Sequence, residues 1–480
     1  MAHNNKAPKE HEGIITVTKK GLGFVDISEG ESILIRQGDT LTALSGDTVR
    51  VAPTGFERGT RAGKVTEILH RGQEKFVGRV IEDDGQPRFF ADHRKMYTPF
   101  IIANDVPEKD QKVVFHFTGW NEKENLPEGE IEEVLGKVGD HEVEMRALLL
   151  REGFEADFPA PVQEEAEVLE ETGEQLLKDG MEGRKDFRGT TTFTIDPLTA
   201  KDFDDAISVK ELGDGKYEIG IHIADVSYFV KEGSSIDKEA RHRATSVYLV
   251  DRTIPMLPHV LSENLCSLRP NEDRLAMSAV FTLDEQGGIL DEWYGETIIH
   301  SDKRFVYEEA QEILNNQKGE FLEELNTLKR LADLLRAKRT KRGAVTFDRA
   351  EVKVDVDENG KPTRVYLKES IDTNKLVEDF MLLANENVSR HMSEIGKQSK
   401  TPRPFIYRIH DSPDEEKIEA LKEFVEALGH DLEFDPQQGV TGKDLNQLFK
   451  QIEDTPEEYL IKTTAIRSMS KAIYTTRNIG

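Results

Sequence analysis

Four aspartates stand within ten positions of the segment TIDPLTAKDFDDAISV, which covers residues 194–209. They are Asp196, Asp202, Asp204 and Asp205, and the apolar residues around them indicate buried strands. Carboxylates this close repel one another, and unpaired charges beside a buried strand are costly. The chain must therefore either leave them in a solvated acidic turn or neutralise them with a cation.

The spacing of the acids distinguishes between an EF-hand loop, a solvated acidic turn and a site for one or two divalent cations. An EF-hand loop starting at Asp196 would need oxygen ligands where Leu198, Ala200 and Ile207 stand, so this loop is excluded. Phe203 splits the acids and AISV follows at once, which argues against the solvated turn. Hard oxygen ligands without a neighbouring His or Cys favour Mg²⁺ or Mn²⁺. Four carboxylates suffice for two ions about 4 Å apart, an arrangement that serves phosphodiester hydrolysis.

Length and composition describe a multidomain globular protein. A chain of 480 residues is too long for one core, and 37% hydrophobic with 32% charged residues suits a soluble protein. No apolar run is long enough for a transmembrane helix, and the N-terminal segment has no signal-like apolar core. The single cysteine, Cys266, fits a reducing cytoplasm. The net charge of −28 argues against indiscriminate nucleic-acid binding but permits a local basic groove.

The pattern along the chain predicts an α+β multidomain fold. Short alternating segments with Gly and Asp between them predict two five-strand barrels of OB size, and an acidic helical connection and one large mixed α/β domain follow. The predicted boundaries are a disordered lead-in over 1–11, barrels over 12–70 and 74–150, a connection over 151–190 and the large domain over 191–480.

Within the large domain, YEIGIHIADVSYFV (217–230) is expected to form a pair of strands, and a hairpin is expected around Gly287 and Gly288. Leucines at helical spacing predict a helix that stops at Gly343, and NKLVEDFMLLANENVSRHM (374–392) predicts another.

Five blocks in order resemble the ribonuclease II/R family. They are TIDPLTAKDFDDAISV, IHIADVSYFV, ARHRATSVYL, TIPMLPHVLSENLCSLRPNEDRLAMS and YRIHDSPDEEKI. The resemblance implies two tandem cold-shock/OB domains before the family's catalytic domain. It also implies a processive 3′→5′ exoribonuclease that releases nucleoside 5′-monophosphates from single-stranded RNA, with Mg²⁺ or Mn²⁺ assisting attack by water.

The resemblance also implies roles for particular residues. The four aspartates match the family's active-site aspartates, with Asp204 the one most closely tied to catalysis and the other three as metal ligands. Tyr248 matches the tyrosine that stacks on the terminal nucleotide. KKGLGFVDI (19–27) resembles an RNA-binding strand, in which Phe24 would offer a ring to a base and Lys19 and Lys20 would lie beside phosphates. Phe24 as an ordinary core residue is the alternative.

Other residues carry two interpretations each. Arg339 and Arg342 belong to a basic run that would contact RNA phosphates or would simply complement the dipole at a helix C-terminus. His222 and Asp225 are expected to be structural rather than metal ligands. Cys266 is expected to be a small core residue rather than a nucleophile.

Two features depart from the family pattern. The helical domain that commonly precedes the barrels is not seen, and the chain stops at IRSMSKAIYTTRNIG, where family members continue with the rest of the catalytic domain and a third OB domain. We therefore expect a partial catalytic domain with weak activity. The rival functions are an RNA-binding protein without catalysis and an endonuclease. We expect a cytoplasmic monomer that acts on RNA 3′ ends, away from membranes, with the ribosome or degradation machinery as candidate partners.

Overall fold

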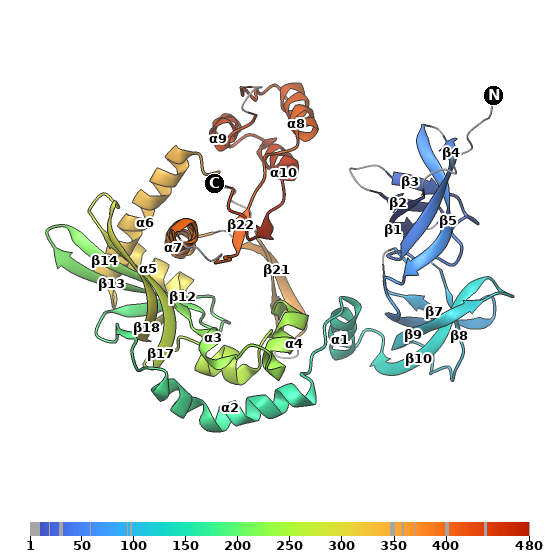
Figure 1. Cartoon of the computed structure of the whole chain (residues 1–480), viewed down its shortest axis with the longest axis horizontal. Helices are drawn as coiled ribbons and strands as arrows, with labels where there is room; N and C mark the ends of the chain where they lie inside the picture. Colours follow the sequence, from blue (N-terminus) through green and yellow to red (C-terminus); the bar gives the residue numbers. More distant parts are fainter. Residues whose placement is uncertain are drawn as a thin grey trace. The chain divides into compact units, whose positions relative to one another are not determined.

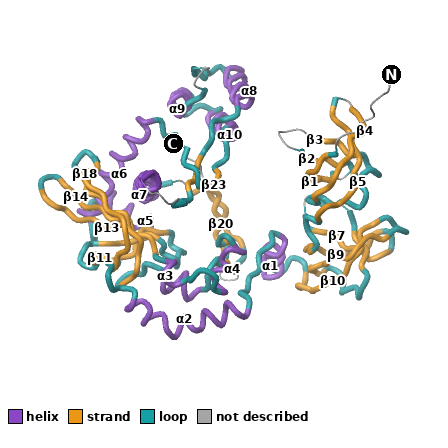
Figure 2. Tube along the Cα trace, viewed as in Figure 1, coloured by secondary structure: helices purple, strands orange, loops and turns teal. Residues whose placement is uncertain are grey.

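The computed structural model divides the chain into two compact units (Figures 1 and 2). The first holds Met1–Phe158, Tyr248–Ile254 and Val356–Lys361, and the second holds the remainder. The residues that the structure describes are 10–18, 20–27, 32–57, 59–93, 95–96, 98–345, 351–357, 360–368, 370–398, 403–435 and 439–479.

A closed barrel of five strands begins the first unit. Its strands are β1 (His11–Val17), β2 (Gly23–Asp26), β3 (Ser32–Ile35), β4 (Thr48–Glu57) and β5 (Thr60–His70), in the order β1-β2-β3-β5-β4. Side chains alternate between the two faces of each strand. Ile15, Val25 and Ile33 therefore fill the interior, whereas Phe24, next to Val25, is half-buried and outside that core.

A second closed barrel follows in the same unit, with strand order β10-β8-β7-β6-β9. Its strands are β6 (Lys75–Asp83), β7 (Gln86–Ala91), β8 (Phe100–Ile102), β9 (Gln111–Asn121) and β10 (Leu126–Lys137). Phe76, Phe89, Phe100 and Phe115 pack at its centre. Helix α1 (His141–Arg151) begins at Asp140, whose carboxylate accepts from Val143 N, and buries Ala147 against this barrel.

The second unit is built on a seven-stranded sheet of order β11-β18-β17-β14-β13-β12-β19. The strands are β11 (Lys185–Asp186), β12 (Thr192–Asp196), β13 (Asp205–Gly213), β14 (Lys216–Ala224), β17 (Asp273–Leu283), β18 (Ile289–His300) and β19 (Lys303–Val306). Most neighbours are antiparallel, but β12 pairs in parallel with β19, and β11 pairs in parallel with β18. The predicted hairpin is the β17–β18 turn, closed by a hydrogen bond from Gly287 N to Asp284 O.

Three helices supply the apolar layer over this sheet (Figure 1). They are α5 (Tyr307–Asn316), α6 (Leu322–Arg342) and α7 (Asp372–Gln398). The predicted leucines of α6, among them Leu325 and Leu328, are buried in the core with Phe281 and Phe305. Helix α6 ends at Gly343, whose φ of 109° only glycine adopts easily.

Another group of helices includes α2 (Ala160–Asp179), α4 (Ser235–Arg243) and the π-helix η1 (Val260–Leu265), and α2 packs against the other two. The expected pair of strands over 217–230 is wrong. β14 ends at Ala224, and Asp225 then accepts a hydrogen bond from Tyr228 N and begins the short helix α3 (Val226–Phe229). An N-terminal cap on so short a helix outweighs the apolar pattern.

Helices α8 (Glu415–Ala427), α9 (Gly442–Gln451) and α10 (Glu458–Ser468) have a core of their own around Leu421, Leu448 and Ile461. Three pairs of strands lie outside these layers: β15 (Val247–Tyr248) with β16 (Thr253–Ile254), β20 (Glu351–Val356) with β21 (Pro362–Lys368), and β22 (Tyr407–Ile409) with β23 (Ile473–Thr475). Among the helices of the described residues, none is long and apolar enough to cross a bilayer.

The start of α9 touches the end of α6 so closely that only glycine fits. A Cβ added to Gly442 would lie 1.9 Å from Gly343 O, which is backbone and cannot move aside cheaply. We expect Gly442→Ala to lower the free energy of unfolding by about 1–3 kcal/mol, the usual cost of overpacking. Gly396→Ala is the matched control, because nothing lies within 4 Å of its added Cβ on helix α7. Urea titration compares the two, and a Gly442→Ala protein as stable as the control would contradict the contact.

Candidate active site

The predicted aspartates gather at one edge of the seven-stranded sheet. Asp196 is the last residue of β12 and Asp205 is the first of β13, and these neighbouring strands are antiparallel. The end of one strand and the start of the next therefore lie at the same edge. Asp202 and Asp204 lie in the loop that joins them.

Hydrogen bonds from distant segments hold the backbone of the joining loop. Ser267 Oγ accepts a hydrogen bond from Phe203 N at 3.0 Å and donates to Lys201 O at 2.9 Å. Ala224 N donates to Asp204 O at 2.9 Å. Phe203 is buried, whereas Asp202 is half-buried and Asp204 exposed. The buried ring thus anchors a loop whose acids remain accessible.

Arg304 of β19 fixes the other half of the loop. Its Nη2 donates to Pro197 O at 2.6 Å and to Leu198 O at 2.9 Å. Arg304 thus donates to carbonyl oxygens that follow Asp196 in the chain, and not to the Asp196 carboxylate itself. Arg304 therefore positions the loop and only partly offsets the negative charge.

Burial disfavours the ionised forms of these acids. Loss of hydration raises the pKa of Asp196 to about 7, and the charges of Asp205 and Asp202 add to the effect. Burial, followed by the charge of Asp204, raises the pKa of Asp205 to about 6. The pKa of Asp204 is also raised, first by desolvation from surrounding protein and then by Asp202, although its surface is open to solvent.

The residues present fit a hard divalent cation. Asp196 Oδ2 is buried and has no hydrogen-bond partner among the described residues, and the same is true of Thr194 Oγ1 close by. The hydroxyl lies near enough to lower the pKa of Asp196 somewhat, but its geometry does not satisfy the carboxylate. An unpaired buried carboxylate oxygen among further carboxylates is a suitable ligand set for Mg²⁺ or Mn²⁺. Within the part of the chain described, no three of the four aspartates bring ligand oxygens within 4.8 Å of one another.

Other buried carboxylates of this unit are neutralised by arginine. Asp225 pairs with Arg184 at 2.6 Å, and Asp379 pairs with both Arg336 and Arg339. Asp196 receives no such ion pair among the described residues. The contrast indicates that the charge at the sheet edge serves a purpose other than packing.

Two further side chains at the edge were not predicted from the sequence. Tyr307 follows β19 directly, and burial, followed by the charges of Asp196 and Asp205, raises its pKa to about 12. Its phenol is therefore protonated at neutral pH, and Asn374 of α7 lies beside it. Tyr307 comes directly after the strand that pairs with β12, but that parallel pairing is not evident in the sequence.

The expected structural residues lie in the interior. His222 is fully buried between Ser278 Oγ, at 2.7 Å from Nδ1, and Ser208 Oγ, at 2.9 Å from Nε2. Desolvation lowers its pKa to about 3, so the ring is neutral. Cys266 is buried, and burial raises the pKa of its thiol to about 12, which makes it a poor nucleophile.

The predicted RNA-binding residues occupy different places. Tyr248 ends strand β15 in the first unit and is 67% exposed. In the first barrel, Phe24 is half-buried on the outer side and Lys20 is exposed, whereas Lys19 lies outside the described residues. A stacking or phosphate-binding role for these side chains stays a prediction.

The basic run at the end of α6 makes structural pairs. Arg339 is an ion-pair partner of the buried Asp379, and Arg342 Nη2 lies 3.0 Å from Glu386 Oε2 on α7. Contact of Arg339 and Arg342 with RNA stays a prediction, and the structure gives both an additional role in joining α6 to α7.

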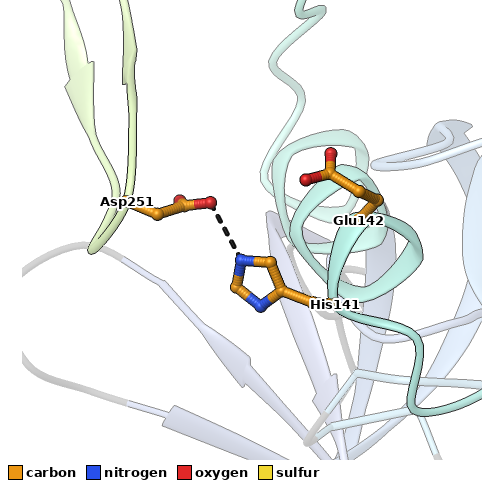
Figure 3. A group of neighbouring side chains, drawn as sticks. All are labelled: His141, Glu142 and Asp251. Atoms are coloured by element: carbon orange, nitrogen blue, oxygen red, sulfur yellow. Dashed lines mark hydrogen bonds and ion pairs between the residues drawn. The ribbon is translucent and has the colours of Figure 1, made fainter. Parts of the chain in front are cut away.

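A second cluster of possible metal ligands lies in the first unit (Figure 3). His141, Glu142 and Asp251 bring ligand atoms within 4.8 Å of one another. Asp251 Oδ2 is 2.9 Å from His141 Nε2, and Arg252 pairs with both acids. Hydrogen bonding by Arg252 is the main reason that the pKa of Asp251 falls to about 2. Arginine already balances these carboxylates, so the cluster is an ion-pair network that ties α1 to the β15–β16 turn.

Comparison with known proteins places these features in one family. The RNB domain model matches residues 184–480, the cold shock domain model residues 89–159 and the ribonuclease B OB domain model residues 13–68. Ribonuclease R of Thermotoga maritima is 36% identical over 98% of this chain and 66% of that protein. Ribonuclease R 2 of Lactococcus lactis is 31% identical over 98% of this chain and 72% of that protein.

Solved structures agree with this assignment. Mycoplasma genitalium RNase R, in complex with ribose-methylated single-stranded RNA, has a TM-score of 0.88 and 26% identity, and the match covers 97% of this chain and 74% of that one. Yeast Ssd1, a pseudonuclease, shares the fold with a TM-score of 0.69 at 19% identity, over 97% of this chain and 63% of that one. Two OB-type barrels before a mixed α/β domain with an edge of aspartates define an RNB-type architecture. The chain belongs to the ribonuclease II/R family, whose catalytic module is the RNB domain, and it spans 66% of the length of the Thermotoga relative.

The raised pKa of Asp196 predicts an unusual dependence of stability on pH. Between about pH 4, near the ordinary pKa of aspartate, and about pH 7, the folded protein holds a proton that the unfolded chain has lost. Stability should therefore fall as the pH rises through this window. With a chelator present to remove divalent cations, we expect the free energy of unfolding of Asp196→Asn to exceed that of the parent at pH 7.5 by on the order of 1 to 4 kcal/mol. The excess should be smaller at pH 4.5. Urea titrations at both pH values measure the effect, and an equal gain at both would show that the charge is not its cause.

Proposed function

We propose that this chain acts as a 3′→5′ exoribonuclease on single-stranded RNA and releases nucleoside 5′-monophosphates processively. The observation that carries the proposal is the sheet edge where Asp196 and Asp205 are held in a desolvated setting beside Asp202 and Asp204, and among the described residues no arginine forms an ion pair with Asp196 or Asp205. Family membership supports the same reaction. The shared fold alone does not, because a pseudonuclease has it too.

The reaction adds water across the bond between phosphorus and the 3′ oxygen of the penultimate nucleotide. Oxygen from water becomes part of the released 5′-phosphate, and the 3′ oxygen leaves and takes up a proton. Asp196, Asp202 and Asp205 would hold Mg²⁺ or Mn²⁺, which when bound would supply Lewis acidity at the phosphate and lower the pKa of water.

The chain's own groups divide the remaining tasks. Arg304 and Ser267 keep the aspartate loop in place through its backbone. Asp204 is the exposed acid and so the one best placed to accept a proton from water. The protonated phenol of Tyr307 offers a donor near Asp196 and Asp205.

RNA contact is proposed for aromatic and basic side chains outside the sheet edge. The exposed ring of Tyr248 and the half-buried ring of Phe24 offer faces on which bases stack, and Lys20 offers a charge to phosphate. A similar protein, Mycoplasma genitalium RNase R, is known in complex with single-stranded RNA, which supports this class of substrate.

The test uses a 5′-labelled single-stranded RNA with Mg²⁺ and, in parallel, with a chelator. We expect the full-length RNA to be converted to a short 5′-labelled end product with few intermediates, together with mononucleotides detected by chromatography, and no reaction in the chelator. Internal fragments would indicate an endonuclease. Binding of the RNA without any cleavage would indicate the RNA-binding alternative, and either result would reject the proposal.

The role of Asp204 separates binding from chemistry. Asp204→Asn keeps the shape and removes one negative charge, so the affinity for RNA should hold or rise while hydrolysis falls by at least about 10²-fold, as expected for a group used in the transition state. Filter binding and single-turnover cleavage provide the two measurements. Asp284→Asn, in the β17–β18 turn, is the matched control for loss of one aspartate charge, and an Asp204→Asn protein that cleaves as fast as this control would remove Asp204 from the mechanism.

The cation is tested without reference to activity. A ligand that binds only the folded state raises the thermal midpoint. We expect Mg²⁺ or Mn²⁺ to raise the midpoint of the parent and to have little effect on the Asp196→Asn/Asp205→Asn double variant. Mutation of the second cluster, His141→Gln, should leave the response intact. If the double variant responds like the parent, the cation binds elsewhere.

A further inference from the structure

A basic cavity lies in the second unit, at the junction of four elements. Its volume is about 910 Å³, and its walls come from the β17–β18 turn, the last turns of α6, the middle of α7 and the start of α9. Six cations line it: Lys338, Arg339, Lys341, Arg342, Arg390 and Lys443. Asp379 and Glu386 are the acids among the lining residues, so positive charge dominates in a chain whose net charge is −28.

Half of these cations already have carboxylate partners. Arg339 pairs with Asp379 and Arg342 with Glu386, while Arg390 Nη2 lies 2.7 Å from Glu292 Oε2. In the part of the chain that the structure describes, no carboxylate pairs with Lys338, Lys341 or Lys443. The Nε of Arg339 is also buried, and none of the described residues offers it an acceptor. Uncompensated donors thus face the cavity from more than one helix.

Helix dipoles favour some of these cations but do not account for Lys443. Lys341 and Arg342 lie in the last turn of α6, where a cation is favourable in any case. Lys443 is the second residue of α9, where the positive end of the dipole disfavours a cation. Its position is fixed by the close contact of Gly442 with Gly343. The fold therefore brings a cation to the cavity against the local preference of its own helix.

The cavity is separate from the aspartates. Asp205 pairs with Ile223 on β14, which pairs with Met277 on β17. The turn at Gly287 follows Leu283, six residues further along β17. At about 3.3 Å per residue, the two places lie roughly 20 Å apart along the strand.

Size and lining indicate the class of ligand. Small-molecule sites typically enclose about 300–1,000 Å³, and the cavity lies within this range. Lysine ammonium groups bind phosphate as point charges. Ile289, Leu335 and Leu383 add an apolar wall for a ring. We propose that this cavity binds a nucleoside di- or triphosphate, with its phosphates at Lys338, Lys341 and Lys443, independently of the aspartate site.

The experiment measures binding of ADP to the full chain by calorimetry. A chelator is present, so that no divalent cation can hold the nucleotide at the aspartates. We expect saturable binding of ADP, weaker binding of inorganic pyrophosphate and none of adenosine. The Lys338→Gln/Lys443→Gln variant should bind ADP at least tenfold more weakly, and the control Lys178→Gln/Lys238→Gln, which removes two exposed lysines elsewhere in the unit, should bind like the parent.

Thermal midpoints within experimental error of the parent establish that the variants fold. Equal ADP affinity in both double variants, adenosine binding as tightly as ADP, or no saturable binding would each overturn the proposal. If ADP does not bind but Lys338→Gln/Lys443→Gln weakens binding of single-stranded RNA, the surface is a phosphate track for RNA and not a nucleotide site. Because no cleavage is measured, failure here leaves the proposed exoribonuclease activity untouched.

Discussion

The desolvated carboxylate of Asp196 is the constraint around which the second unit is organised. An ionised group so placed needs either a proton or a cation, and its pKa of about 7 means that the folded chain alone favours the proton at mildly acidic pH. The strand that carries it is fixed on one side by β13 and on the other by β19. The fold thus holds an unfavourable charge in position, which is a common cost of a functional site.

Ion pairing shows that other buried carboxylates of the unit are neutralised, whereas that of Asp196 is not. The buried acids Asp225 and Asp379 are matched by arginines, although the chain is acidic overall. The charge of Arg304 lowers the pKa of Asp196, yet its Nη2 donates to loop carbonyls and not to that carboxylate. The basic cavity at the other end of the sheet is the complementary case, because its three lysines have no carboxylate partner among the described residues. One end of the sheet thus has an excess of negative charge and the other an excess of positive charge, and these suit a cation and an anion respectively.

Much of the site could be predicted because its chemistry is local in sequence. Four aspartates in ten positions identify themselves, and strand alternation places Val25 inside the barrel and Phe24 outside once the strand is known. Arg304 and Tyr307 could not be predicted, because the pairing of β12 with the distant β19 brings them to the loop. Ser267 reaches the loop from the segment after η1, which is equally remote in sequence. The sequence predicts a strand where α3 lies, because the apolar residues after Asp225 fit a strand as well as a helix. The N-terminal cap that Asp225 provides decides between the two.

The parallel pairing of β12 with β19 has a consequence for how the protein is made. Thr194 is aligned with Arg304, so a gap of 110 residues must be synthesised before this edge can form. Contacts of such separation form late and slowly during folding. The β12–β13, β13–β14 and β17–β18 pairings can form first, whereas the other side of the Asp196 strand stays unpaired until β19 leaves the ribosome. A nascent chain would therefore acquire its barrels early and complete its aspartate edge only after most of the sheet is in place.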